Sequence, residues 1–232
     1  MKNYDPKNIL ISQHIPKCGG SSFDNILRKW FGLGFFTHYY NHKRQKPAKR
    51  IPFVNWFSNF KPVCVHGHFD KEKDGKGIFD YYPETTQIIT FLRDPLEVQL
   101  SMYFYMRKLI SEGSLYWQGE QIKEMKYGGD IDAWVEQRPL YMLRFLPEGI
   151  NSSNYKEILQ KYFVHIGIVE EFQQSVDVLA KKLGKQSVEV PLENTTKRDL
   201  NPSNASVKVF EENHKLEYNI YNFAFKKMIN DQ

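Results

Sequence analysis

Short apolar runs alternate with stretches of helical periodicity along the 232 residues of the chain. Apolar runs of four to eight residues bounded by turn-forming residues are typical of buried strands, whereas apolar positions three and four apart indicate helices. Four segments predict strands: residues 9–11, 62–66, 87–92 and 163–168. Four others predict helices: 23–29, a segment starting near 95, 170–183 and 206–228. This alternation predicts an α/β fold of three layers, a mostly parallel sheet flanked by helices.

Several helix ends carry their own signals. Asp94 and Pro95 suit the cap and the first turn of a helix, and Gly184 suits the end of the helix over 170–183. Residues 206–228 place apolar side chains at the spacing of one amphipathic helix. The connection over 31–60 is basic and rich in aromatic residues, and we predict no regular element in it.

A glycine-containing loop follows the first predicted strand. Residues 15–23 read Ile-Pro-Lys-Cys-Gly-Gly-Ser-Ser-Phe and lead into a helix. Glycines allow close backbone approach, a helix start offers unpaired N–H groups, and Lys17 adds a positive charge. The loop therefore predicts an anion site, although Lys17 precedes the glycines and so departs from the Walker motif.

Two further groups of polar residues follow predicted strands. Arg93 ends the strand over 87–92 and Ser101 lies about two turns along the next helix, so both could contact one phosphate. His66 and His68 flank a glycine after the strand over 62–66 and could supply a general base. This histidine pair could alternatively bind a metal ion. Because no third Cys or His stands at the spacing of a zinc finger, we predict no metal site.

Composition limits the class of protein. A hydrophobic content of 41% supports a core, and we predict one domain over 1–232. No run approaches ~18 apolar residues, so we predict no transmembrane segment, and Cys18 and Cys64 favour reduced thiols in the cytoplasm. The net charge of +5 does not argue for a nucleic-acid partner. Five Lys or Arg residues lie within 42–50, and this run is either a solvated loop or a site for an anionic partner.

The motifs together resemble those of a known family. Residues 16–22, the His-Gly-His at 66–68, and 93–97 with Ser101 are similar to the signature of PAPS-dependent sulfotransferases. Within that family they resemble the heparan/dermatan sulfate 2-O-sulfotransferase-like branch. Residues 166–172 and 194–198 resemble later stretches of the same branch, so the similarity runs from about residue 9 to 228. It implies the P-loop-NTPase-like sulfotransferase fold, in a bacterial-type soluble form that could be peripheral to a membrane.

The resemblance also implies a donor and its binding residues. The donor would be 3′-phosphoadenosine-5′-phosphosulfate (PAPS), which leaves as the 3′,5′-bisphosphate PAP. Lys17 and one of the two histidines, His66 or His68, would be catalytic. The residues implied in donor binding are Lys17, Cys18, Gly19, Gly20, Ser21, Ser22, Arg93, Ser101, Lys197 and Arg198.

The expected reaction is transfer of a sulfuryl group to an acceptor hydroxyl, on a glycan or glycolipid that could be anionic. Two alternatives stay open. One is a nucleotide-dependent kinase, which would need Asp94 as a metal-holding carboxylate. The other is a non-catalytic module that binds a polyanionic glycan through residues 42–50. The sequence indicates no oligomeric state.

Overall fold

The fold is built on five parallel strands. The computed structural model describes residues 1–41, 46, 48–114, 116–117, 120–121, 129–190 and 198–231. The strands of the main sheet are β1 (Leu10–Gln13), β2 (Phe35–His38), β3 (Cys64–Gly67), β4 (Gln87–Leu92) and β7 (Phe163–Ile168). They lie in the order β2-β3-β1-β4-β7, and every pairing is parallel. A separate antiparallel pair joins β5 (Tyr116–Trp117) and β6 (Glu120–Gln121).

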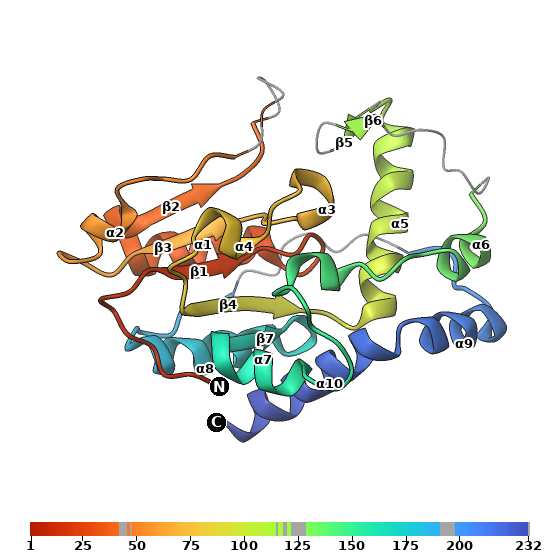
Figure 1. Cartoon of the computed structure of the whole chain (residues 1–232). Coiled ribbons are helices and arrows are strands. Elements are labelled where there is room, and N and C mark those ends of the chain that lie inside the picture. The colour runs from red at the N-terminus through yellow and green to blue at the C-terminus, as the bar shows by residue number, and fades with distance from the viewer. Residues whose placement is uncertain are drawn as a thin grey trace.

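Helices cover both faces of the sheet (Figure 1). The α-helices are α1 (Gly20–Phe31), α2 (Val54–Phe57), α3 (Lys71–Asp74), α4 (Ile78–Tyr81), α5 (Pro95–Ser111), α6 (Ile131–Glu136), α7 (Tyr155–Tyr162), α8 (Phe172–Leu183), α9 (Asn204–Asn213) and α10 (Lys215–Asn230). Three short 3₁₀ helices are η1 (Gly32–Gly34), η2 (Met142–Phe145) and η3 (Val169–Glu171).

Alternating side chains of the strands separate two cores. In β1, Leu10 packs with α1 and α8 on one face, whereas Ile11 packs with α7, α10 and η2 on the other. Successive side chains of a strand point to opposite faces, so each strand contributes to both cores. A third cluster joins α5, α6 and α9 beyond the sheet. The predicted three-layer α/β fold is confirmed.

The strongest local predictions are confirmed. β4 and β7 have the predicted bounds. The Asp94 carboxylate accepts hydrogen bonds from Leu96 N (2.9 Å) and Glu97 N (3.1 Å) at the start of α5. Gly184 ends α8 with a φ of 63°.

Two predictions are wrong. The connection over 31–60 contains β2, a four-residue strand that pairs with β3 at the edge of the described sheet, and the short helix α2. Its strand character comes from that pairing rather than from a local pattern. The single helix predicted over 206–228 is two helices that meet at His214. Phe210 of α9 packs against α5 and α6, whereas Ile220 of α10 packs under the sheet, so the halves serve different cores.

The parallel topology brings the loops after β1, β3 and β4 to one edge of the sheet. Gln13 at the end of β1 pairs with Gly67 of β3 and with Thr90 of β4, so these strands end together. All the arrows of the main sheet in Figure 1 point the same way. Ligands of such sheets bind beyond the carboxyl ends of the strands. Among the described helices, none is long and apolar enough to cross a membrane.

A buried carboxyl group fixes the segment that faces this edge. Glu217 of α10 is 2% exposed and accepts hydrogen bonds from the backbone N–H groups of Met142 (2.5 Å) and Leu143 (3.2 Å). These bonds cap η2, whose Arg144 side chain binds the buried Asp70 carboxylate at 2.5 and 3.1 Å. Burial raises the pKa of Glu217 to about 7, against an ordinary value of 4.5.

Because the pKa of Glu217 is higher in the folded state, the folded protein binds a proton that the unfolded chain releases. Its contribution to stability is therefore complete below about pH 4.5 and lost as the pH rises to about 7. We expect the free energy of unfolding to fall by about 1–3 kcal/mol over this range. Glu217→Gln should remove this dependence in urea unfolding at pH 5 and 8. Glu112→Gln, at an exposed position, should retain it; equal slopes in the Glu217 variant and the unmodified chain would contradict this role.

Candidate active site

The loop after β1 turns sharply into α1. The N–H of Cys18 donates to the carbonyl of Ile15 (3.1 Å), and Lys17 and Gly19 have φ values of 68° and 73°. A left-handed conformation at a non-glycine residue costs ~1 kcal/mol, so packing holds Lys17 in this strained conformation. Gly19 is the N-cap of α1 and supplies no side-chain hydrogen bond. The first amides of α1 therefore lack intrahelical acceptors and can bind an anion.

Lys17 carries the positive charge of this loop. Its Nζ lies 4.0 Å from the centroid of the Tyr105 ring. Burial, and next the charge of Arg93, lower the pKa of Lys17 to about 8. Within the described part of the chain no carboxylate forms an ion pair with Lys17, which is therefore able to pair with an external anion.

One face of α5 lies toward the loop. Glu97, Ser101, Tyr105 and Lys108 follow one another at spacings of four, four and three residues, which places them on the same helix face. Because Tyr105 contacts Lys17, Ser101 lies one turn closer to the start of α5 on the side that faces the loop. Ser101 is 9% exposed.

Arg93 lies close to Lys17 and to two carboxylates. Its Nη1 donates to the Lys17 carbonyl at 3.5 Å and its Nη2 to Glu97 at 3.2 Å. The Glu170 carboxylate lies 3.9 Å from Arg93 Nε, and this buried nitrogen donates no hydrogen bond to any described residue. The structure thus gives Arg93 carboxylate neighbours that the sequence analysis did not predict.

Arg198 reaches the same group of charges. Its two Nη atoms donate to the Glu97 carboxylate at 2.9 and 2.6 Å, and this pairing lowers the pKa of Glu97. Glu97 therefore joins Arg93 and Arg198, which are far apart in sequence. Lys197 lies outside the described residues.

The two predicted histidines occupy different depths. His66 of β3 is fully buried, and its Nδ1 forms a hydrogen bond of 2.8 Å with Ser12 Oγ. Burial lowers the pKa of His66 to about 3, so its ring is neutral. His68, just beyond β3, is half-buried at the sheet edge, and its Nδ1 donates to the carbonyl of His14 at 2.8 Å. A neutral His68 then carries its lone pair on Nε2.

A third histidine, missed in the sequence, connects these two. The His14 ring stacks on His68 with centroids 4.3 Å apart and on His66 with centroids 5.2 Å apart. Its Nδ1 forms a hydrogen bond of 2.9 Å with the Tyr39 hydroxyl. Burial, then the charges of His68 and His66, hold the pKa of His14 well below its usual range. The available sequence signal was position, since His14 directly follows β1 as His68 follows β3.

The glycines join the loop to this histidine cluster. A Cβ at Gly20 would lie 1.7 Å from His14 Nε2, and a Cβ at Gly19 would lie 2.6 Å from the Phe172 ring. Both positions therefore exclude a side chain for packing reasons. Ser21 is exposed and Ser22 is buried in the same first turn of α1.

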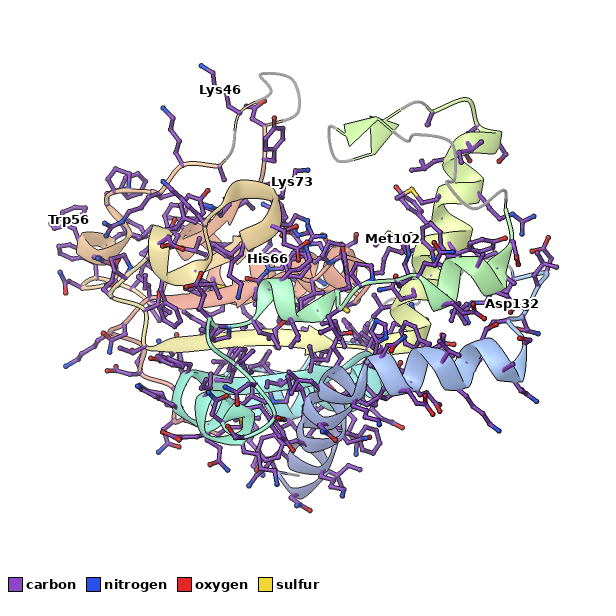
Figure 2. All side chains as sticks on the ribbon, turned by 45° about the vertical axis from the view of Figure 1, so that its right-hand side comes forward. Lys46, Trp56, His66, Lys73, Met102 and Asp132 are labelled. Carbon is purple, nitrogen blue, oxygen red and sulfur yellow. The ribbon has the colours of Figure 1, made fainter. Side chains whose placement is uncertain are left out.

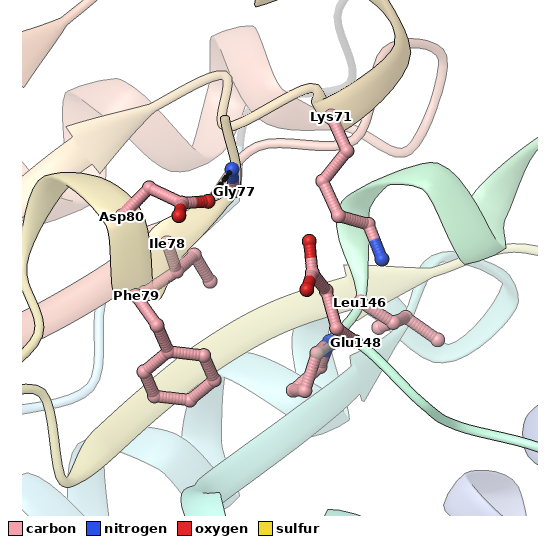
Figure 3. Close-up of a pocket in the computed structure, with 8 residues that line it drawn as sticks. Lys71, Gly77, Ile78, Phe79, Asp80, Leu146 and Glu148 are labelled. Atoms are coloured by element: carbon pink, nitrogen blue, oxygen red, sulfur yellow. Dashed lines mark hydrogen bonds between the residues drawn. The ribbon is translucent and has the colours of Figure 1, made fainter. Parts of the chain in front are cut away.

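The remaining candidates are not at the site or are not reactive. The thiols of Cys18 and Cys64 are buried in different cores, and burial raises the pKa of both. A small pocket beside α4, shown in Figure 3, lies between Lys71 and Glu148, and none of the predicted site residues lines it. In the described ranges no group of three His, Cys, Asp or Glu side chains could hold a metal ion.

Comparisons with known proteins find similarity only among solved structures. The chain matches no protein-family model and no curated protein. The crystal structure of mouse sulfotransferase SULT7A1 complexed with PAP is 14% identical over 90% of this chain, with a TM-score of 0.40. This chain spans 65% of the length of the mouse protein. A sulfotransferase from Alicyclobacillus acidocaldarius is 16% identical over 94% of this chain and 96% of its own length, with a TM-score of 0.47. Similarity at this level assigns no activity to the chain.

Gly20→Ala tests the contact between the loop and the histidines. The added methyl group would displace the His14 ring, and we expect a loss of roughly 1–3 kcal/mol in the free energy of unfolding. The imidazole NMR signals of His14 and His68 should also shift. Gly77→Ala is the matched control, because its Cβ would meet side chains rather than backbone, the flexible Lys71 at 3.0 Å and Asp80 Oδ2 at 3.8 Å. If both variants lose the same stability, the contact is not specific.

Proposed function

We propose that the chain is a PAPS-dependent O-sulfotransferase that transfers a sulfuryl group to a hydroxyl of a carbohydrate. One observation carries this proposal. Lys17, which has no carboxylate partner in the described structure, and the uncapped start of α1 lie at the same sheet edge as His68. An anion cradle next to a neutral imidazole suits transfer of an anionic group to an alcohol.

The loop would hold the 5′-phosphosulfate of the donor. Lys17 and the amides of residues 18–22 would bind its oxygens, with the hydroxyl groups of Ser21 and Ser22 as further donors.

The second phosphate would lie beside Arg93, Ser101 and Arg198. Glu97 opposes an anion there, but Arg198 pairs with it through two hydrogen bonds and offsets its charge. Arg93 then remains able to attract the 3′-phosphate that distinguishes PAPS from ATP. We include Lys197 in this set on the resemblance alone.

His68 is the proposed general base. As the acceptor oxygen forms its bond to sulfur and the bond from sulfur to the leaving bisphosphate oxygen breaks, the hydroxyl proton moves to His68 Nε2. Lys17 would stabilise the negative charge on the leaving oxygen. His66 would hold His68 in position indirectly, because the His14 ring stacks on both histidines.

Acceptor and location complete the proposal. The resemblance favours a glycan or glycolipid hydroxyl, and the Tyr39 ring, 5.0 Å from His68, adds an aromatic wall beside the base. Two buried cysteines that form no disulfide favour the cytoplasm. We propose no nucleic-acid partner.

A nucleotide-dependent kinase is the principal rival. It would need Asp94 to hold a metal ion near the phosphates, yet Asp94 Oδ1 accepts both amide hydrogens that start α5. This use of the carboxylate favours sulfuryl transfer over phosphoryl transfer. A binder of polyanionic glycan would leave the position of His68 unexplained.

Ligand-dependent melting separates these functions. PAP at a hundred times its dissociation constant should raise the melting temperature by about 5–10 °C, whereas ATP with Mg²⁺ should not. Lys17→Met should weaken PAP binding at least about tenfold by calorimetry, because one full charge is lost. Lys61→Met, remote from the site, is the control. Equal stabilisation by ATP with Mg²⁺ would rule out the proposal.

The pH dependence of PAP affinity follows from Lys17. Since its pKa is about 8 without ligand, affinity should fall by up to about tenfold per pH unit above pH 8. Lys17→Met should lack this dependence. A fall of the same size in the variant would place the titrating group elsewhere.

His68→Ala should separate turnover from binding. Loss of a general base typically lowers turnover by about 10²–10⁴-fold, and PAP affinity should change less than about threefold. His66→Ala should lower stability as well as turnover, because it leaves the Ser12 hydroxyl buried without its partner. His165→Ala, which removes a buried histidine of β7 outside the cluster, should lower stability alone. Loss of PAP affinity in His68→Ala would make this residue structural instead.

A further inference from the structure

Four large apolar side chains project into solvent near α2. Leu33, Phe53, Trp56 and Phe60 are 78%, 49%, 63% and 66% exposed, and together they are called the aromatic face. The other exposed large apolar residues in the described chain are aliphatic and at most 44% exposed. Such a concentration on one surface marks an interaction site rather than ordinary surface apolarity.

Two of the four side chains of the aromatic face contact each other, and a third packs on β2. The rings of Trp56 and Phe60 are 4.9 Å apart, and Phe36 contacts Phe53 at 5.5 Å. The backbone of Gly34 approaches the carbonyl of Pro62 so closely that a Cβ would lie 2.1 Å from it, so the chain next to Leu33 and the chain next to Lys61 lie side by side. These residues lie on the chain just before β2 and just before β3.

The surrounding segment is strongly basic. Residues 25–69 contain eight Lys or Arg and no Asp or Glu, whereas the whole chain has 32 basic and 27 acidic residues. The rest of the chain therefore has 24 basic and 27 acidic residues and is net negative. Lys61 Nζ lies 5.6 Å from the Phe57 ring, so its aliphatic stem follows the apolar surface. The net positive charge of the chain is therefore carried by this segment of the sequence.

From this combination we infer that the aromatic face docks onto an anionic lipid bilayer. Trp and Phe insert at the membrane interface, and Lys and Arg are attracted to anionic headgroups by roughly fivefold in affinity per cation. A second copy of the chain is disfavoured as occupant, since it would bring two segments with a net charge of +8 together.

The geometry leaves the candidate active site open. Trp56 points outward at the end of the molecule opposite α5, and His66 lies well inside it (Figure 2). The aromatic face is next to the amino ends of β2 and β3, whereas His68 follows the carboxyl end of β3. Membrane docking would hold the protein at a surface with the site facing away.

Co-sedimentation with lipid vesicles tests the inference. The full chain should bind vesicles of phosphatidylcholine and phosphatidylserine at 7:3 at least about tenfold more tightly than vesicles of phosphatidylcholine alone. Binding should weaken on raising NaCl from 50 to 500 mM. W56S/F60S should lose at least about tenfold in affinity, and K49E/K61E should lose the preference for anionic lipid. V209S/I229S, exposed apolar positions elsewhere, should bind like the unmodified chain.

The variants alter exposed or half-buried positions, and their melting temperatures verify that they fold. Unchanged vesicle binding by folded W56S/F60S would overturn the inference, as would equal binding to both vesicle types. Light scattering at matched concentration measures the oligomeric state of the unmodified chain and of W56S/F60S. A dimer that W56S/F60S converts to monomer would assign the aromatic face to a second copy and also overturn it.

Discussion

The approach of the His14 ring to Gly20 is the constraint on which the candidate site depends. Only hydrogen fits at Gly20, since a Cβ would lie 1.7 Å from His14 Nε2. That space lets His14 lie over the start of α1 while its ring stacks on His68 and its carbonyl accepts the His68 Nδ1 hydrogen. His14 therefore contacts the start of α1 and also sets the tautomer of His68, the proposed base. Gly20 therefore acts on the candidate site through the neighbouring side chain of His14.

Charge in the site is organised around Glu97. Lys17 is short of a carboxylate partner within the described structure, whereas Arg93 and Arg198 share Glu97. Arg93 also lies 3.9 Å from the Glu170 carboxylate, so two carboxylates hold the two arginines in place. Burial lowers the pKa of Lys17, so the charge of this loop is sensitive to pH and to a bound anion. The site thus combines one responsive cation with two that are fixed.

The sequence predicted those features that depend on neighbouring residues. The strands β4 and β7 and the Asp94 cap each have a local signal of apolar runs, turn residues or spacing. β2 lacks such a signal, because its pairing with β3 is its main support. The break at His214 depends on Phe210 and Ile220 packing into different cores. His14, Tyr39 and Glu97 were missed for the same reason, since each acts through partners distant in sequence.

The segment that sequence patterns described least well, residues 31–60, links the two functional surfaces that we propose. Leu33 precedes β2 on the aromatic face, and Tyr39 follows β2 in the histidine cluster. Four strand residues separate these ends by about 13 Å. An edge strand has one free side, so its sequence is constrained less by the sheet than by what its two ends must contact. This explains why the residues of β2 show a weak strand pattern and yet connect the proposed membrane surface to the proposed base.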